Sequence, residues 1–347
     1  MARLGDVCEI LDNKRIPITA SDRIPGPYPY YGANGIQDYV ADYIFDDELI
    51  LLAEDGGNFG SKDKPIAYRV SGKCWVNNHA HVLKPKAGYD IDYVCYSLMY
   101  YDVSNLVNGA TRQKLTQADM RDMIIPDWSL EEQKHIAALL GKLNGLISLR
   151  KQQLAKLDEL VKARFVEMFG DPIKNTLGIP TKMLGEVCLL KAGMTTPADA
   201  IFDYDIEHQI PCYGGNGIRG YVKESTQHGT YPIIGRQGAL CGNVQLAQGD
   251  FHATEHAVLV TPLQQMNIYW LFFLLKYMDL YRYHTGAAQP GLAVQTLNTV
   301  DIPVADLALQ DKFAALVGKV NGQRLTTQQS LDKLEVLKKS LMQEYFG

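Results

Sequence analysis

Residues 126–170 read PDWSLEEQKHIAALLGKLNGLISLRKQQLAKLDELVKARFVEMFG, and residues 303–347 repeat this stretch without a gap. Identical residues recur at a constant offset, among them Gln133 and Gln310 near the start and Phe169 and Phe346 at the end. A repeat unit of about half the chain is too long for a solenoid module. The pattern therefore predicts two copies of one domain, each followed by one long helix, about a pseudo-twofold axis.

The sequence upstream of each helix repeats more loosely. Residues 4–8 (LGDVC) match residues 184–188 (LGEVC), and residues 31–36 (YGANGI) match residues 213–218 (YGGNGI). Residues 55–56 (DG) match residues 237–238 (QG) in the same way. The helical copies are alike, whereas the globular copies share mainly a scaffold. This divergence favours two recognition surfaces with different targets.

We therefore expect an α+β protein with two mixed α/β globular domains, separated by a pair of long antiparallel helices. The expected segments are a first domain over 1–128, a helix over 129–170, a linker and second domain over 171–304, and a helix over 305–347. Short β-like runs stand at 49–52, 66–70 and 81–83, and again at 231–234 and 257–260. Helices are expected near 92–101 and 267–279, and a short one after Thr116, where Asp119 replaces the usual Glu of a capping box.

Each long helix carries a heptad-like apolar seam with polar interruptions. Ser129 is the expected N-cap of the first, and each helix would span about 55–60 Å at 1.5 Å per residue. Antiparallel pairing would cover both seams; the alternative is that each helix packs onto its own domain. The seam consists of Ile136, Leu140, Leu143, Ile147, Leu154, Leu157 and Val161 in the first helix and Phe313, Val317, Val320, Leu331, Leu334 and Leu341 in the second.

Composition narrows the function classes. The chain has 347 residues, 46% of them hydrophobic and 21% charged, with no apolar run long enough for a membrane span and no secretion-signal pattern near the start. Six cysteines without a C-x-x-C pair indicate buried thiols in a cytoplasmic protein. Residues 1–128 carry 13 Lys/Arg against 18 Asp/Glu, and residues 182–304 carry 7 against 10. Neither domain is basic, which argues against tight nucleic-acid binding by the chain alone.

Two patterns imitate catalytic motifs. Residues 215–220 (GNGIRG) fit the dinucleotide fingerprint, but the following residues are β-like where a helix N-terminus is needed. Residues 252–256 (HATEH) fit an inverted zinc-protease pattern, which requires a helix to bring both histidines to one metal. Here the pattern leads into a strand, so the two histidines would lie about 13 Å apart. We expect neither nucleotide nor metal binding.

The Tyr-Gly-x-Asn-Gly loops are retained in both copies. Gly and Asn tolerate positive φ, and a Gly-rich loop lets backbone amides approach an anion. A tight turn needed only for folding remains the alternative. The loops over 109–115 and 286–292 hold similar places, and Arg112, Gln113, Lys114 and Gln289 have side chains suited to phosphate or base contacts.

Taken together, these features resemble the specificity subunit of a type I restriction–modification system. The resemblance covers essentially the whole chain. It rests on the doubled domain and helix, the Tyr-Gly-x-Asn-Gly-Ile loops, the spacing of Pro126 from Gln133 and of Pro303 from Gln310, and the Phe-Gly-Asp-Pro junction at 169–172. The chain is shorter than expected for many members, which implies trimmed recognition domains.

The resemblance implies a cytoplasmic, non-catalytic subunit whose two target-recognition domains each read one half of a bipartite double-stranded DNA sequence. The helix pair would set the half-site spacing and dock two methyltransferase subunits, which bind S-adenosylmethionine, while motor–nuclease subunits join for restriction. The sequence agrees, since it lacks both the N/D-P-P-Y/F tetrapeptide of amino-methylation and a phosphate-binding G-x-x-x-x-G-K-S/T motif. A two-headed protein–protein scaffold with a coiled-coil spacer is the alternative function.

The candidate DNA-contacting residues come from the retained loops and their surroundings. They are Tyr31, Gly32, Asn34, Gly35, Glu54, Asn58, Lys62, Asn78, His79, Thr111, Arg112, Gln113 and Lys114 in the first domain, and Tyr213, Asn216, Gly217, Arg219, Arg236, Gln237 and Gln289 in the second.

Overall fold

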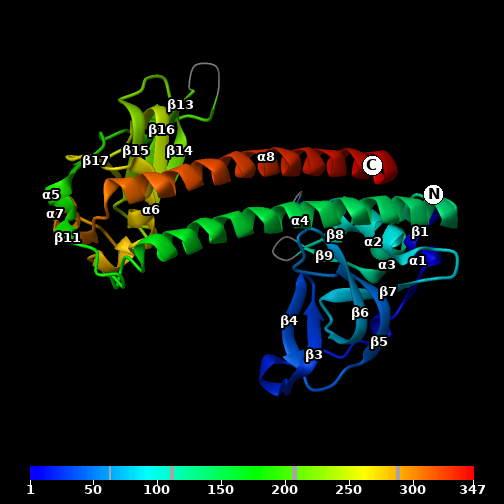
Figure 1. Cartoon of the computed structure of the whole chain (residues 1–347). Helices are drawn as coiled ribbons and strands as arrows, with labels where there is room; N and C mark the ends of the chain where they lie inside the picture. The colour runs from blue at the N-terminus through cyan, green and yellow to red at the C-terminus, as the bar shows by residue number, and fades with distance from the viewer. Residues whose placement is uncertain (62–63, 110–112, 205–208, 287–289) are drawn as a thin grey trace. The chain divides into compact units, whose positions relative to one another are not determined.

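The computed structural model describes residues 1–61, 64–109, 113–204, 209–286 and 290–347. The chain forms two compact units (Figure 1). The first unit contains Met1–Arg150 together with Ser330–Gly347, and the second contains Lys151–Gln329. Each unit therefore holds one globular domain and parts of both long helices.

The first unit is built on a six-stranded sheet with the order β2-β7-β5-β6-β3-β4 (Figure 1). Its β3 runs parallel to β6, and the other neighbours are antiparallel. The main elements are β2 (Cys8–Ile10), β3 (Pro25–Gly32), β4 (Gly35–Val40), β5 (Phe45–Ala53), β6 (Ala67–Val76), β7 (Ala80–Pro85) and α2 (Ile91–Met99). The β runs expected at 49–52, 66–70 and 81–83 fall on β5, β6 and β7, and the expected helix at 92–101 is α2.

Short elements complete the first unit. They are β1 (Ala2–Arg3) paired with β10 (Ile124–Ile125), β8 (Val107–Asn108) paired with β9 (Lys114–Leu115), α1 (Leu4–Val7), α3 (Gln117–Arg121), η1 (Asp12–Lys14) and η2 (Ala20–Asp22). The expected cap of α3 is present, since Asp119 N donates to Thr116 Oγ1 at 3.2 Å.

The second unit repeats this topology strand for strand, in the order β12-β17-β15-β16-β13-β14, with β13 parallel to β16. Its main elements are β12 (Cys188–Ala192), β13 (Ile210–Gly214), β14 (Gly217–Val222), β15 (Gln227–Gly235), β16 (Val244–Ala253), β17 (Ala257–Pro262) and α6 (Ile268–Tyr277). Shorter ones are β11 (Thr181–Met183) paired with β18 (Asp301–Pro303), α5 (Leu184–Val187), α7 (Val294–Asn298), η3 (Ala198–Ala200) and η4 (Leu280–Tyr283). The loose sequence repeat thus corresponds to a repeat of the whole six-stranded sheet, whereas the β8–β9 pair of the first unit has no counterpart among the described strands of the second.

Side-chain alternation along the central strands creates two apolar cores in each unit. In β5, Ile50 and Leu52 pack with α2 and the long helices, while Leu49 and Leu51 pack with residues such as Val70 on the other side of the sheet. Successive residues of a strand point to opposite faces, so a continuous apolar run supplies both cores. In the second unit, Ile234 and Ile233 divide between two cores in the same way.

The long helices are α4 (Leu130–Phe169) and α8 (Leu307–Phe346). Ser129 caps α4 as expected: Glu132 N donates to Ser129 Oγ at 3.3 Å, and Ser129 N donates to Glu132 Oε2 at 3.0 Å. The helix ends at Phe169, and the φ of +74° at the following Gly170 and its close approach to Thr176 leave no room for a Cβ there.

Within each unit, one end of α4 packs in the same core as the opposite end of α8. In the first unit, Ile136 and Leu140 of α4 share a core with Leu341 of α8. In the second, the rings of Phe165 and Phe313 meet edge-on with centroids 5.4 Å apart. This is the pairing expected of antiparallel helices. Each helix also packs on a sheet domain at both of its ends, so the two alternatives left open by the sequence are combined.

Every residue of the seam is buried or half-buried. Both long helices nevertheless keep exposed apolar side chains outside it: Leu146, Leu149, Leu160 and Val166 on α4, and Leu325, Val336 and Leu337 on α8.

The described part of the chain holds no helix with the length and apolar character to cross a bilayer. All six cysteines are buried and free, and burial raises the pKa of the equivalent Cys8 and Cys188 thiols to about 12.

Candidate functional site

The retained Tyr-Gly-x-Asn-Gly loops are tight turns of β-hairpins. Gly32 pairs with Gly35 across the β3–β4 turn, and Gly214 pairs with Gly217 across the β13–β14 turn. Gly35 and Gly217 have φ values of +115° and +100°, a region that favours glycine. The turn geometry accounts for Gly35 and Gly217, and it leaves the side chains of the Asn residues before them exposed in both units.

In the first unit, this turn meets three other segments. Asn34 Nδ2 donates to the Gly56 carbonyl oxygen at 3.0 Å, which links the hairpin to the loop after β5. Asn77 N donates to the Tyr31 carbonyl oxygen at 3.0 Å and adds the turn between β6 and β7. Leu115 N donates to the Glu54 carbonyl oxygen at 2.8 Å and adds β9. We call this meeting point of four segments the loop junction.

The second unit has the same loop junction with equivalent hydrogen bonds. Thr254 N donates to the Tyr213 carbonyl oxygen at 2.9 Å, and Leu292 N donates to the Arg236 carbonyl oxygen at 2.8 Å. The backbone of the residue after β15 matches too, since Arg236 N donates to the His256 carbonyl oxygen at 3.0 Å just as Glu54 N donates to that of His79 at 2.9 Å. Glu54 and Arg236 are thus equivalent positions with opposite charge.

Side chains at the first loop junction form ion pairs. The Glu54 carboxylate lies 2.6 Å from Arg15 Nη1 and 2.9 Å from Lys114 Nζ. His79 Nδ1 lies 2.7 Å from Asp55 Oδ1. Burial raises the pKa of a carboxyl group, but hydrogen bonds from Arg15 and Lys114 outweigh it and hold the pKa of Glu54 below its usual value. Glu54 is therefore a charged acceptor whose donors come from this chain.

The second loop junction differs in its side chains. Asn243 Nδ2 donates to Asn216 Oδ1 at 2.6 Å, while Arg219 and Gln237 are exposed. Within the part of the chain that the structure describes, Arg236 Nε, Thr254 Oγ1 and His256 Nδ1 are buried and have no hydrogen-bond partner. Unsatisfied buried polar atoms are costly, so they are expected to gain partners when a ligand or water binds.

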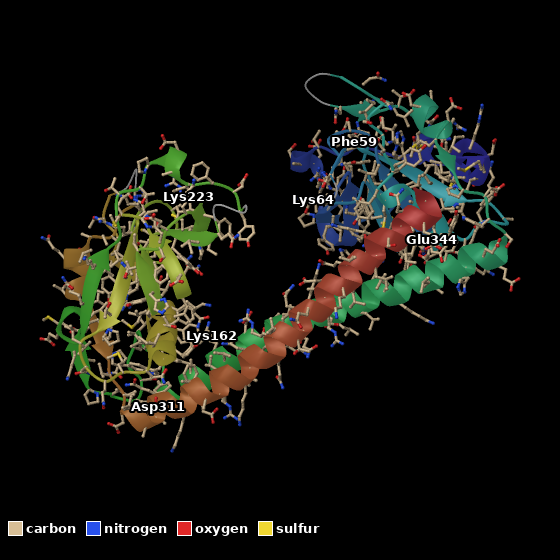
Figure 2. All side chains as sticks on the ribbon, turned by 90° about the horizontal axis from the view of Figure 1, so that it is seen from above. Phe59, Lys64, Lys162, Lys223, Asp311 and Glu344 are labelled. Atoms are coloured by element: carbon tan, nitrogen blue, oxygen red, sulfur yellow. The ribbon has the colours of Figure 1, made fainter. Side chains whose placement is uncertain are left out.

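Most of the candidate residues that the structure describes lie at or beside these two loop junctions. Asn58 belongs to the loop after β5, where its Nδ2 donates to the Pro65 carbonyl oxygen at 3.3 Å, and Phe59 and Lys64 on the same loop are labelled in Figure 2. Asn78 and Gln113 are exposed. The candidates Lys62, Thr111, Arg112 and Gln289 lie outside the described residues.

Sequence reasoning missed three residues of the first loop junction: Asp12, Arg15 and His81. Asp12 and Arg15 come from η1 and the residue after it, far from Glu54 in the chain and without a motif. His81 is a buried polar residue at a position where the repeat has the buried Val258. That mismatch between the copies was the available signal.

The two motif imitations have the local structure that excludes them. Residues 215–220 form a hairpin turn and the start of β14. The glycines are therefore followed by a strand and not by the helix N-terminus that the dinucleotide fingerprint requires. His252 lies one residue before the end of β16, His256 directly precedes β17, and Glu255 and His256 form a turn where the sequence predicts a continuous strand. His252 instead contacts Thr196 Oγ1 at 2.7 Å and Thr226 Oγ1 at 3.1 Å, and burial lowers its pKa.

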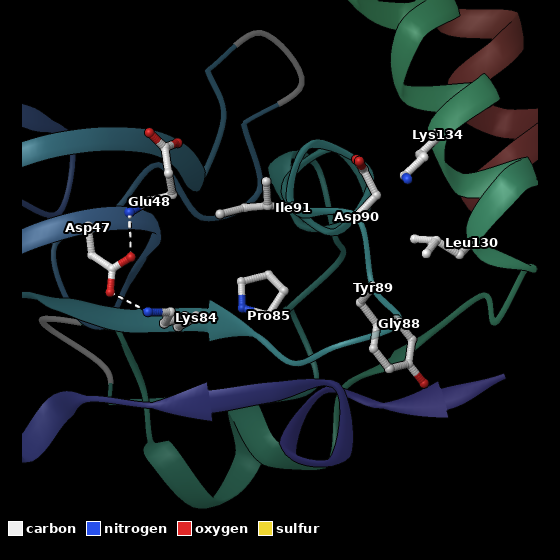
Figure 3. A pocket seen from close by; sticks show the side chains of 10 residues that line it. All are labelled: Asp47, Glu48, Lys84, Pro85, Gly88, Tyr89, Asp90, Ile91, Leu130 and Lys134. Atoms are coloured by element: carbon white, nitrogen blue, oxygen red, sulfur yellow. Dashed lines mark hydrogen bonds and ion pairs between the residues drawn. The ribbon is translucent and has the colours of Figure 1, made fainter.

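A separate hollow of about 400 Å³ lies in the first unit (Figure 3). It is lined by the start of β5, the end of β7, the start of α2 and the first turn of α4, with Asp47 paired to Lys84 on its wall. These are the opposite ends of β5 and β7 from the loop junction. None of the candidate DNA-contacting residues lines it, so it is not part of the candidate site.

Comparison with known proteins gives a consistent picture. The family described as "Type I restriction modification DNA specificity domain" matches residues 1–159 and again residues 178–336. The EcoprrI specificity subunit of a type I restriction enzyme from Escherichia coli is 40% identical over 207 residues, which cover 56% of this chain and 49% of that protein. A putative type I specificity subunit of Haemophilus influenzae is 37% identical over 145 residues, covering 42% of this chain and 37% of that protein. The matches thus span half or less of these relatives.

Solved structures share the fold over the whole chain. The S subunit of a type I restriction–modification system from M. genitalium superposes with a TM-score of 0.70 at 16% identity, covering 100% of this chain and 95% of that one. A structure from a study of complex assembly and conformational transition of the type I R-M system gives a TM-score of 0.55 at 15% identity, covering 99% and 96%.

Proposed function

The chain belongs to the family of type I restriction modification DNA specificity domains, and from this premise we propose that it is the sequence-reading subunit of a restriction–modification complex. Each loop junction would contact one half of a bipartite duplex DNA target. The observation that carries the proposal is that both units hold the same four segments together while presenting different side chains, Glu54 in one and Arg236 in the other.

The side chains at each junction suit base reading. Exposed amide side chains such as Asn34 and Gln237 can donate to and accept from base edges, and Arg219 can contact phosphate or guanine. In the second unit, the unpaired Arg236 Nε and His256 Nδ1 would gain partners on binding. Two junctions with different side chains would read two different half-sites, which gives an asymmetric target.

Partner subunits would supply the chemistry and much of the affinity. Neither domain is basic, so partners are expected to provide many phosphate contacts. Exposed leucines on both long helices, including the equivalent Leu160 and Leu337, offer apolar area for two methyltransferase subunits. Those subunits would bind S-adenosylmethionine and methylate adenine, and motor–nuclease subunits would add restriction. This chain would be the non-catalytic, cytoplasmic member of the complex.

Exchange of the first domain tests the assignment of half-sites. Residues 1–128 are replaced by the corresponding domain of a homologue, the chain is co-expressed with its methyltransferase, and methylated adenines are mapped across the host genome. We expect one half-site to change and the other to persist, because each unit holds its own loop junction. The reciprocal exchange of residues 171–304 is the matched control. An unchanged bipartite target in both exchanges would contradict the proposal.

Lengthening the helices tests their role as a spacer. Insertion of seven residues into α4 and seven into the paired part of α8 preserves the seam, which repeats in heptads. Each helix grows by about 10 Å at 1.5 Å per residue, so the half-sites are expected to move apart by about three base pairs at 3.4 Å each. The methylation map measures this directly. Loss of duplex binding together with retained protein partners would favour the two-headed scaffold instead.

A further inference from the structure

Three polar side chains at the second loop junction have atoms without partners. They are Arg236, which follows β15, and Thr254 and His256, which lie between β16 and β17. In the described part of the chain, Arg236 Nε, Thr254 Oγ1 and His256 Nδ1 are buried and make no hydrogen bond. Arg236 N donates to the His256 carbonyl oxygen at 3.0 Å, which joins the two segments. The three residues therefore belong to one place, and we call them the Arg236 triad.

The first unit has polar side chains at the same three positions, and there the chain itself supplies their partners. The residues are Glu54, Asn77 and His79. Asn77 Nδ2 donates to Gln37 Oε1 at 3.0 Å, and His79 Nδ1 lies 2.7 Å from Asp55 Oδ1. Glu54 has the two cationic partners described above. These three side chains thus need no ligand to be paired.

The second unit lacks such partners because the residues that supply them differ. Where the first unit has Gln37 and Asp55, the second has the exposed Arg219 and Gln237. Among the described residues, no ion pair joins a carboxylate to Arg236. A buried donor of a cation is costly when it has no acceptor, so a ligand that brings acceptors is favoured at the Arg236 triad.

Arg236 is held directly beside the retained hairpin turn. A Cβ built on Gly235 would lie 1.8 Å from the Gly215 carbonyl oxygen, so the residue before Arg236 packs against the turn with no space for a side chain. The Arg236 side chain is half-buried. Its Nε is covered without a partner, while Nη1 and Nη2 make no hydrogen bond in the described chain and are not enclosed. These two terminal nitrogens are therefore the donors open to a ligand.

The chemistry of the guanidinium selects the ligand. Arginine has only donors, and the major-groove edge of guanine presents two acceptors, O6 and N7, that a pair of these donors matches. Phosphate oxygens are acceptors as well. The exposed amide of Gln237 follows Arg236 in the chain and suits base edges, while the exposed Arg219 supplies a separate cation for phosphate. This set of side chains favours guanine at Arg236.

We propose, on the basis of the function proposed above, that Arg236 is a specificity-determining residue of the second unit and reads a guanine of the second half-site through Nη1 and Nη2. DNA would supply acceptors that the chain does not. The first unit has no such reader at the equivalent position, because the carboxylate of Glu54 is held by Arg15 and Lys114. One position of the second half-site would therefore be fixed as a G·C base pair.

A base analogue combined with substitutions at Arg236 tests this reading. The chain is purified as the full complex with its methyltransferase, and the half-sites are assigned by the domain exchange described above. Each guanine of the second half-site is then replaced singly by 7-deazaguanine, which lacks the N7 acceptor but still pairs with cytosine. The kcat/KM of methyl transfer is measured for the wild type, Arg236→Ala, Arg236→Lys and the control Arg282→Lys, which changes an exposed arginine of η4.

In the wild type, we expect 7-deazaguanine at one position to lower kcat/KM by about tenfold, since it removes one hydrogen bond to a charged group. Arg236→Ala should lower kcat/KM on the natural duplex by about 10–100-fold and abolish the effect of the analogue, because the contact is already lost. Arg236→Lys keeps the charge but lacks the paired donors, so its preference for guanine should be intermediate. Arg282→Lys should behave as the wild type, and substitutions in the first half-site should act equally in all four proteins.

A phosphate contact would give a different result: Arg236→Ala would slow methylation of every duplex alike, and the analogue would act equally in the variant and the wild type. A general structural role would lower the unfolding temperature of the complex and weaken discrimination at both half-sites. Either outcome, or a wild type insensitive to 7-deazaguanine at every position, refutes the reading of guanine by Arg236. Failure of the wild-type complex to methylate any bipartite duplex would instead refute the proposed function.

Discussion

At the residue scale, two buried glutamines show how the repeat in sequence becomes a repeat in structure. Gln133 Nε2 donates to the Trp128 carbonyl oxygen at 2.8 Å, and its Oε1 accepts from Asp90 N at 2.9 Å. Gln310 bonds Ala305 and Asn267 N in the same way, at 2.7 and 2.8 Å. Asp90 and Asn267 are the N-caps of α2 and α6. Each glutamine therefore joins a long helix to the helix that covers the sheet.

Replacing these glutamines is expected to destabilise one unit each. Gln133→Ala leaves a partly buried N–H and a partly buried carbonyl oxygen without partners, which costs about 1–2 kcal/mol of the free energy of unfolding of the first unit. Gln310→Ala does the same to the second unit. Urea unfolding followed by circular dichroism measures the loss. The control is Gln323→Ala on the exposed side of α8, which should change stability by less than about 0.5 kcal/mol. Losses as small as the control's would show that the bonds contribute nothing.

At the residue scale, the sequence predicts some contacts and not others. The tight turns, the Ser129 cap and the equivalence of Glu54 with Arg236 follow from local patterns, because turns and caps depend on a few neighbouring residues. The cluster of Asp12, Arg15 and His81 at the first loop junction does not, because its segments are distant in sequence and meet only through the sheet topology. Which bases the junctions read depends on side-chain placement in a DNA groove, which no local pattern encodes.

At the element scale, the long helices contain glycines that the fold of this chain does not require. Gly145 of α4 and Gly322 of α8 occupy equivalent positions, and an added Cβ would meet no other atom within 4 Å at either. Glycine within a helix costs about 1 kcal/mol relative to alanine, because it loses more backbone freedom on folding.

Gly145→Ala and Gly322→Ala are therefore expected to stabilise the chain by about 0.5–1 kcal/mol each, measured as a rise in the urea midpoint. The matched control is Gly35→Ala in the hairpin turn. That site is equally open, but its φ of +115° strains any residue with a side chain, so the substitution should destabilise the chain. A lower urea midpoint for Gly145→Ala or Gly322→Ala would contradict this prediction, because it would mean that the folded chain requires a glycine at that position.

The elements themselves were the most predictable part of the fold. The capped amphipathic helices and the apolar runs of β5, β6 and β7 follow from hydrophobic periodicity, which is a strong signal over long segments. The strand order was not predictable, because the crossing that places β3 parallel to β6 has no local signature. Burial of Phe165 was also missed, since it lies beside the heptad seam and is buried by α6 as well as α8.

At the scale of the whole molecule, the C-terminal ends of the two long helices are buried to different extents in the two units. The last phenylalanine of each helix completes the unit in which that helix ends. Phe169 is 2% exposed and packs against Trp270 and Phe313 in the second unit, whereas the half-buried Phe346 packs against Tyr93 in the first.

Phe169→Ala is expected to cost about 3–5 kcal/mol and to expose the second unit, while Phe346→Ala costs less and exposes the first. Hydrogen exchange with mass spectrometry shows which unit loses protection, and a variant at the exposed Tyr204 serves as the surface control. Loss of protection in the second unit on changing Phe346 would contradict this division.

The division has a consequence for how the protein is made. The second unit is one continuous segment, but the first needs residues 330–347 to cover a core that begins with Leu4. At about 5–20 residues per second, the ribosome requires roughly 10–35 s to cross the intervening segment. During that interval the first unit lacks residues 330–347, and the apolar surface that they cover is accessible to chaperones. We therefore expect the second unit to fold before the first.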